Sequence, residues 1–227
     1  MSWNQYLYQY HKKYGGQFLA GEIDDGLLVL PFKDRPLVVT LSHADDGRGR
    51  SVHYVQARIP VTLAKPYRLT VGAEKKLSGG VNTVLRAVPG LPGGNLLPAD
   101  FGFPEVTKKR LIRSDNYNFT KLVLGSLDFR NALLACPGER VEVRSGPGED
   151  GLHLITVITD AAIDGAMFGG GGGDWYLGNG EDYMTFYGSE EEREQEARRV
   201  EEKFFPRLEH FLDLTRAVYH AVTQWPM

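Results

Sequence analysis

The chain has 227 residues, of which 42% are hydrophobic and 24% are charged, a composition that excludes a wholly disordered or fibrous protein. Its formal net charge of -3 argues against broad electrostatic attraction to nucleic acid, so we expect no nucleic-acid partner. The single cysteine, Cys136, is typical of a reducing compartment and favours a cytoplasmic protein. We expect no membrane insertion, because no apolar stretch approaches the roughly 20 residues that span a bilayer.

The spacing of apolar residues predicts a helix followed by strands at the start of the chain. Residues 2–14 place Trp3, Leu7, Tyr10 and Tyr14 at helical spacing, and Gly15-Gly16 follow as a stop signal. From Gln17 to Gly72 the apolar period becomes two, with turn residues between the segments, which indicates an antiparallel sheet. The alternating sets are Leu27 and Val29; Leu37, Val39 and Leu41; Val55, Ala57 and Ile59; and Tyr67, Leu69 and Val71.

The middle of the chain offers one weak helix and one candidate boundary. Residues 74–88 have helical spacing that Gly79 and Gly80 weaken. The Pro- and Gly-rich loop 89–98 would end that helix and is the best candidate for an internal domain boundary. We nevertheless expect residues 1–227 to form a single domain, because this length is common for one domain.

The stretch Asp100–Thr159 reads as a strand, two capped helices and a hairpin. The charged segment 107–113 suggests an edge strand protected against pairing with another chain. N-cap formers at 114–116 open a helix whose expected buried face holds Phe119, Leu122 and Val123. Ser126 opens a second helix that ends before Pro137, and residues 140–159 form two strands.

This order of elements resembles a soluble region of bacterial proteins of unknown function. The resemblance covers Asp100–Thr159: a charged extended segment, the Asp115-Asn116 helix start, a second helix that ends in Leu133-Leu134-Ala135, and alternating strands. It implies a domain of unknown function with an α+β fold. It implies no activity and no catalytic residue.

The firmest helix prediction lies at the C-terminus. A capping box at Ser189 and Glu192 opens it, three-four spacing continues almost to the end, and Pro206 should kink or split it. We therefore predict an α+β fold, in which an antiparallel sheet is covered by a long C-terminal helix and two short central helices. Phe204 and Phe211 should pack against that sheet.

Two candidate sites follow from residue type and spacing. Arg110, Arg113 and Lys121 gather about the helix that starts near Asp115, where free amides and cations favour an anion such as phosphate. The Gly-rich run that follows residue 168 holds a candidate ligand loop. Its residues, Gly171, Asp174, Trp175 and Asp182, fit one calcium nonapeptide and a ragged second copy. Calcium sites of that kind need several stacked repeats, so we expect no cofactor and no metal.

No short catalytic motif is present in the sequence, which makes an enzyme the less favoured class. The leading hypothesis is a non-catalytic cytoplasmic binding or interaction module with an unknown protein or small-molecule partner, which can also form a homo-oligomer. The main alternative is a cup in which the long helix grips a curved sheet around an apolar small molecule. A further alternative is a hydrolase whose site is assembled only in the fold.

Overall fold

The computed structural model describes residues 3–21, 26–45, 51–73, 97–98, 101–146, 151–160 and 189–226. The chain divides into two compact units. Unit 1 contains residues 1–57 and 160–209, and unit 2 contains residues 58–159 and 210–227. The single domain predicted from the sequence stays a prediction. The expected helix 74–88 and all of the loop 89–98 except Leu97 and Pro98 lie outside the described residues.

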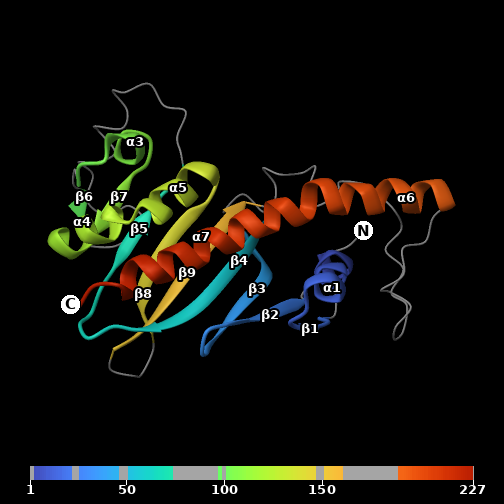
Figure 1. Cartoon of the computed structure of the whole chain (residues 1–227), viewed down its shortest axis with the longest axis horizontal. Helices are drawn as coiled ribbons and strands as arrows, with labels where there is room; N and C mark the ends of the chain where they lie inside the picture. The colour runs from blue at the N-terminus through green and yellow to red at the C-terminus, as the bar shows by residue number, and fades with distance from the viewer. Residues whose placement is uncertain are drawn as a thin grey trace. The chain divides into compact units, whose positions relative to one another are not determined.

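Unit 1 combines helix α1 with a meander of strands. Gly15 and Gly16, with φ of 84° and 92°, end α1 at the predicted place because glycine adopts positive φ without steric cost. The strands follow one another in the order β1-β2-β3-β4, and the β1–β2 and β2–β3 pairs are antiparallel. Helix α1 lies beside β1 and β2 (Figure 1). The elements are α1 (Trp3–Tyr14), β1 (Gln17–Leu19), β2 (Leu27–Phe32), β3 (Arg35–Asp45) and β4 (Ser51–Thr62), whose last residues belong to unit 2.

The C-terminal helix has three consecutive parts: α6 (Glu190–Arg199), a π-helical turn η2 (Val200–Phe204) and α7 (Phe205–Thr223). The predicted capping box is confirmed, because Ser189 and Glu192 exchange both hydrogen bonds. The predicted irregularity at Pro206 takes the form of the π turn, in which the Phe205 N–H donates to the Val200 carbonyl. Pro206 has no N–H to donate and therefore disturbs the hydrogen bonding of an α-helix. The wider π turn lies just before this residue.

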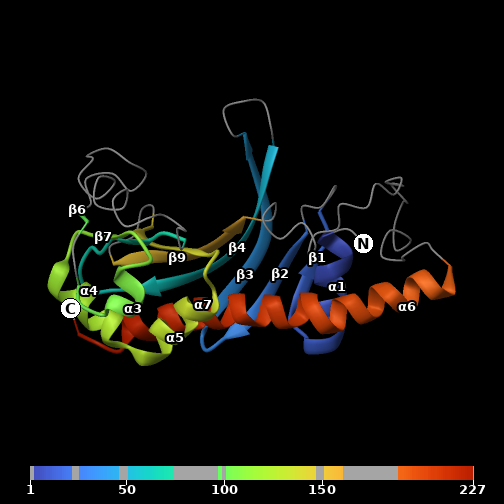
Figure 2. The same cartoon turned by 90° about the horizontal axis from the view of Figure 1, so that it is seen from above.

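Unit 2 continues with the strand order β4-β9-β8-β5-β7-β6. The pairs β9–β8, β8–β5, β5–β7 and β7–β6 are all antiparallel. Helices α4, α5 and the end of α7 lie on one face of these strands (Figure 2). The elements are β5 (Leu69–Val71), β6 (Leu97–Pro98), α3 (Pro104–Thr107), β7 (Ile112–Ser114), α4 (Tyr117–Gly125), α5 (Leu127–Ala135), β8 (Arg140–Ser145) and β9 (Leu152–Asp160).

The predicted fold class is confirmed: the protein is α+β, with an antiparallel sheet and a long C-terminal helix. Phe204 and Phe211 are both buried, as their helical spacing predicted. In unit 2 the alternating side chains of β5 and of the β8–β9 hairpin supply the core from the sheet, including Val71, Val143 and Ile155. The helices supply the rest through one apolar stripe each.

Two local predictions in the central stretch were wrong. Residues 107–113 do not form an edge strand, because α3 and a turn occupy 104–110 and β7 lies between β5 and β6. Leu122 does not share the buried face of Phe119 and Val123. Each helical residue advances about 100° around the axis, so Leu122 lies on the flank of α4.

Candidate functional site

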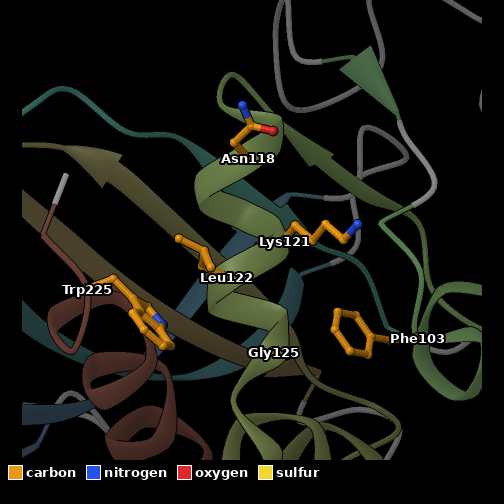
Figure 3. A pocket seen from close by; sticks show the side chains of 6 residues that line it. All are labelled: Phe103, Asn118, Lys121, Leu122, Gly125 and Trp225. Atoms are coloured by element: carbon orange, nitrogen blue, oxygen red, sulfur yellow. The ribbon is translucent and has the colours of Figure 1, made fainter.

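An open groove with a volume of about 500 Å³ lies on unit 2. Four of its lining residues, Asn118, Lys121, Leu122 and Gly125, have the spacing of one face of α4. Phe103, which precedes α3, and Trp225, which follows α7, complete the lining. In Figure 3, Lys121 and Phe103 lie on one side of α4 and Leu122 and Trp225 on the other.

Helix α4 is held in place by its cap and by its opposite face. The Asn116 side chain accepts a 3.0 Å hydrogen bond from the Phe119 N–H and so caps the first turn. Phe119, Val123 and Leu124 are buried on the side away from the groove. The cap and the buried face of α4 therefore fix the orientation of the helix, so its groove face forms without a ligand.

Phe103 forms one wall of the groove in a strained backbone conformation. Its φ of 54° and ψ of 63° lie in the left-handed region, which costs a non-glycine residue about 1 to 3 kcal/mol. The Arg130 guanidinium lies over the Phe103 ring, 4.4 Å from its centroid. The ring is thus fixed at the groove by a contact from α5.

Arg130 is itself anchored by two further contacts. Its Nη1 donates a 2.6 Å hydrogen bond to the Leu124 carbonyl at the end of α4, and its Nε lies 3.0 Å from a carboxylate oxygen of Glu105. A cation at this end of α4 also stabilises the helix dipole. Arg130 therefore joins α3, α4 and α5 beside the groove and fixes the position of Phe103.

The floor and the far wall leave apolar surface in contact with water. A Cβ built on Gly125 meets no atom within 4 Å, so the floor beside α4 is open. Leu122 is 45% exposed and Trp225 is 40% exposed. Tyr117 and Leu127, at the start of α4 and of α5, are exposed large side chains as well, so these two helices expose apolar side chains outside the groove lining too.

Lys121 is the charged residue that lines the groove. Its side chain is exposed, α4 contains no acidic residue, and no ion pair with Lys121 occurs in the part of the chain that the structure describes. The groove therefore combines apolar walls, one positive charge and the amide of Asn118.

Arg110, the first residue of the predicted anion site, is buried and contacts protein carbonyls. Its Nη1 donates to the carbonyls of Gly72 and Glu139, at 3.2 and 2.9 Å. Its Nη2 donates to those of Leu133, at 2.6 Å, and Cys136. Because the last two carbonyls end α5, Arg110 caps this helix with a full positive charge.

The other predicted anion-binding residues have separate surroundings. The carboxylate of Asp115 accepts a 2.9 Å hydrogen bond from the Arg68 N–H, and Asn116 rather than Asp115 caps α4. Arg113 is buried within β7, whereas Lys121 lies at the groove. A shared anion site over these residues stays a prediction, and Lys121 is the member that the structure places on a concave surface.

The predicted ligand loop with Gly171, Asp174, Trp175 and Asp182 lies outside the described residues. Within the described ranges, no group of three or more His, Cys, Asp or Glu side chains gathers at one place to hold a metal ion. Cys136 is buried. Its thiol donates to the His210 carbonyl, at 3.4 Å, which is the contact of a packed side chain.

Sequence reasoning missed most of the groove. Phe103 and Trp225 lie more than a hundred positions apart, and no periodic pattern connects them. The signal available in the sequence was Leu122, an apolar residue about 60° away from Phe119 around the helix, which gives α4 apolar side chains on more than its core face.

Comparison with family models, curated proteins and solved structures found no match for this chain. The resemblance over Asp100–Thr159 therefore rests on the order of elements alone. None of the helices that the structure describes has the length and apolar character of a membrane span.

Proposed function

We propose that this protein is a non-catalytic, cytoplasmic interaction module that binds a segment of a partner protein in the α4 groove. The observation that supports this function is the wall at Phe103: an aromatic side chain kept half-exposed, on a strained backbone, under a contact from Arg130. Strain of this kind persists where the surrounding structure imposes it, and it is frequent at ligand clamps.

The groove suits a protein segment better than an enclosed small molecule. Leu122 and Trp225 in its walls are exposed, and Tyr117 and Leu127 are further exposed apolar side chains at the starts of α4 and α5, as expected of an interaction surface. Enclosed ligand sites bury most of their ligand, which an open groove along one helix does not do. The cytoplasmic assignment is supported by the single cysteine of the chain, Cys136, which cannot form an intrachain disulfide.

Selection from a display library of short random peptides tests this function. Immobilised full-length protein should enrich peptides that a Gly125→Leu variant does not retain, because the leucine side chain fills the floor of the groove. The matched control is Gly125→Ala, which adds one methyl group where no atom lies within 4 Å. The control should retain the peptides.

Two outcomes would contradict the proposal. The first is that no peptide population is enriched above an empty support. The second is that enriched peptides bind the Gly125→Leu variant as well as the wild type, which would move the binding surface away from α4. Circular dichroism of all three proteins verifies that helix content is unchanged before the comparison is made.

A further inference from the structure

We infer that the groove recognises an acidic segment: a short extended stretch of a partner protein that carries a carboxylate for Lys121 and a bulky apolar side chain for the floor at Gly125. This inference rests on the proposed function and specifies the ligand class. The favourable interaction is charge complementarity between one cation and the carboxylate of the ligand, next to apolar walls.

The length of the groove limits the size of the segment. The α4 face runs from Asn118 to Gly125, a distance of about 10 Å along the helix axis at 1.5 Å per residue. An extended chain advances about 3.3 Å per residue, so roughly three ligand residues span this face. The inference therefore concerns a short linear segment and not a folded surface.

The positions of the side chains assign a role to each part of the ligand. Lys121 lies beside α4 on the same side as Phe103, while Leu122 and Trp225 lie on the opposite side (Figure 3). An apolar ligand side chain over Gly125 contacts both aromatic rings. A carboxylate one or two residues along the segment reaches the Lys121 ammonium, and the Asn118 amide is available to the ligand backbone.

The charge of the groove favours an acidic ligand over a basic one. The nearby guanidinium of Arg130 is already paired with Glu105, and α4 supplies no acidic side chain. Lys121 is thus the charge that an incoming segment meets. A lysine or arginine placed beside it is repelled, whereas an aspartate or glutamate is attracted.

The test determines whether the bound peptides are acidic, and then reverses the charge at Lys121. Peptides enriched on the wild-type protein should contain Asp or Glu next to an aromatic or large aliphatic residue. Fluorescence anisotropy with one labelled peptide should give a Kd about threefold weaker for Lys121→Met and about tenfold weaker for Lys121→Glu, as expected for one solvated ion pair and its reversal. A peptide with lysine in place of its acidic residue should recover binding to Lys121→Glu.

Lys108→Glu is the matched control, because Lys108 is also exposed but does not line the groove. Its Kd should stay within a factor of about two of the wild-type value. Raising the salt concentration should weaken the wild-type complex more than the Lys121→Met complex.

The possible failures are distinguishable. Groove-dependent peptides that lack acidic residues, or a Lys121→Glu variant that binds acidic peptides normally, overturn this inference and leave the interaction module intact. A lack of any groove-dependent peptide overturns both. Binding of phosphatidylserine vesicles that Lys121→Glu and Trp225→Ala abolish, without peptide binding, would identify a membrane surface instead. A dimer in light scattering that Gly125→Leu dissociates would identify a second copy of this chain.

Discussion

The phenol of Tyr6 donates a 2.8 Å hydrogen bond to Oε1 of Glu196, and so joins α1 to α6 across 190 residues of sequence. The Tyr6 ring is buried and stacks on Phe204, with 4.6 Å between the ring centroids. Burial of the ring, followed by this hydrogen bond and the charge of Glu196, raises the pKa of Tyr6. Burial also raises the pKa of Glu196, but the hydrogen bond from Tyr6 and then nearby positive charges, Arg199 among them, outweigh it, and that pKa is lowered.

Tyr6→Phe should lower the free energy of unfolding by about 1 to 2 kcal/mol, because it removes a hydrogen bond to a charged group and keeps the ring. Urea unfolding at pH 7 measures the change, with an unchanged slope against urea concentration. Tyr8→Phe is the control, since the described residues give its hydroxyl no hydrogen bond. Equal stability of the two variants would contradict a role for the Tyr6–Glu196 bond.

Alkaline pH should weaken the same contact. The unfolded pKa of tyrosine is about 10, and the folded pKa of Tyr6 lies above it. The stability that the neutral phenol contributes is therefore complete below pH 10 and lost as the pH rises above 10. The difference in unfolding free energy between the wild type and Tyr6→Phe should shrink between pH 8 and pH 11. A constant difference would show that the Tyr6 pKa is not raised.

Acid should weaken the start of α6. The backbone and side-chain hydrogen bonds with Ser189 lower the pKa of Glu192 below 4.5, so the stability contributed by its carboxylate is present above about pH 4.5 and lost as the pH falls through the lower folded value. Amide hydrogen exchange over residues 190–195 should accelerate on acidification relative to α7, after correction for the intrinsic rates.

Ser189→Ala should produce the same effect at pH 7, with exchange in the first turn of α6 about fivefold faster, because the Glu192 N–H loses its acceptor. Ser189→Thr retains a hydroxyl and is the matched control. If the alanine and threonine variants exchange alike, the capping box does not stabilise this turn. Since α6 buries none of its residues, the change should be local, and global unfolding should move little.

The elements that the sequence predicted well are those specified by neighbouring residues. The stop of α1 at Gly15, the cap at Ser189 and the alternation in β8 and β9 each depend on residues within one turn or one strand. Such signals specify local structure without contacts from distant parts of the chain. This locality is the reason that the α+β class and the long C-terminal helix could be predicted.

The features that the sequence did not predict depend on contacts between distant residues. Arg110 was predicted to lie in a charged edge strand and an anion site, because nothing near it in sequence reveals the four carbonyls that it contacts, which come from the residue after β5, from the end of α5 and from the turn before β8. The groove has the same property, since Phe103 and Trp225 meet α4 only in the folded chain. The left-handed conformation of Phe103 has no sequence signal either, because phenylalanine rarely adopts it.

Arg110→Met should destabilise the protein by about 3 to 5 kcal/mol, since it removes four hydrogen bonds from a buried guanidinium to backbone carbonyls and removes the cation from the end of α5. Arg110→Lys should recover only part of this loss, because an ammonium has three donors and lacks the planar fork of a guanidinium. Chemical denaturation measures both. Lys108→Met, at an exposed position two residues earlier, should change stability by less than about 0.5 kcal/mol.

Phe103 allows the strain in the groove wall to be measured directly. Phe103→Gly and Phe103→Ala both remove the ring and its contact with Arg130, so they differ mainly in backbone freedom. At an ordinary site alanine is more stable than glycine by about 0.4 to 1 kcal/mol, because glycine has more unfolded conformations to lose. At φ of 54° the order should reverse, with the glycine variant more stable by about 1 kcal/mol, since glycine adopts the left-handed region without cost. Denaturant melts of the two proteins measure which is more stable. A more stable alanine variant would mean that the Phe103 backbone is not strained in solution.

If the glycine variant is the more stable, peptide binding can be compared as well. Binding that is lost in both variants but recovered in Phe103→Tyr would connect the strained backbone to the aromatic wall that it holds.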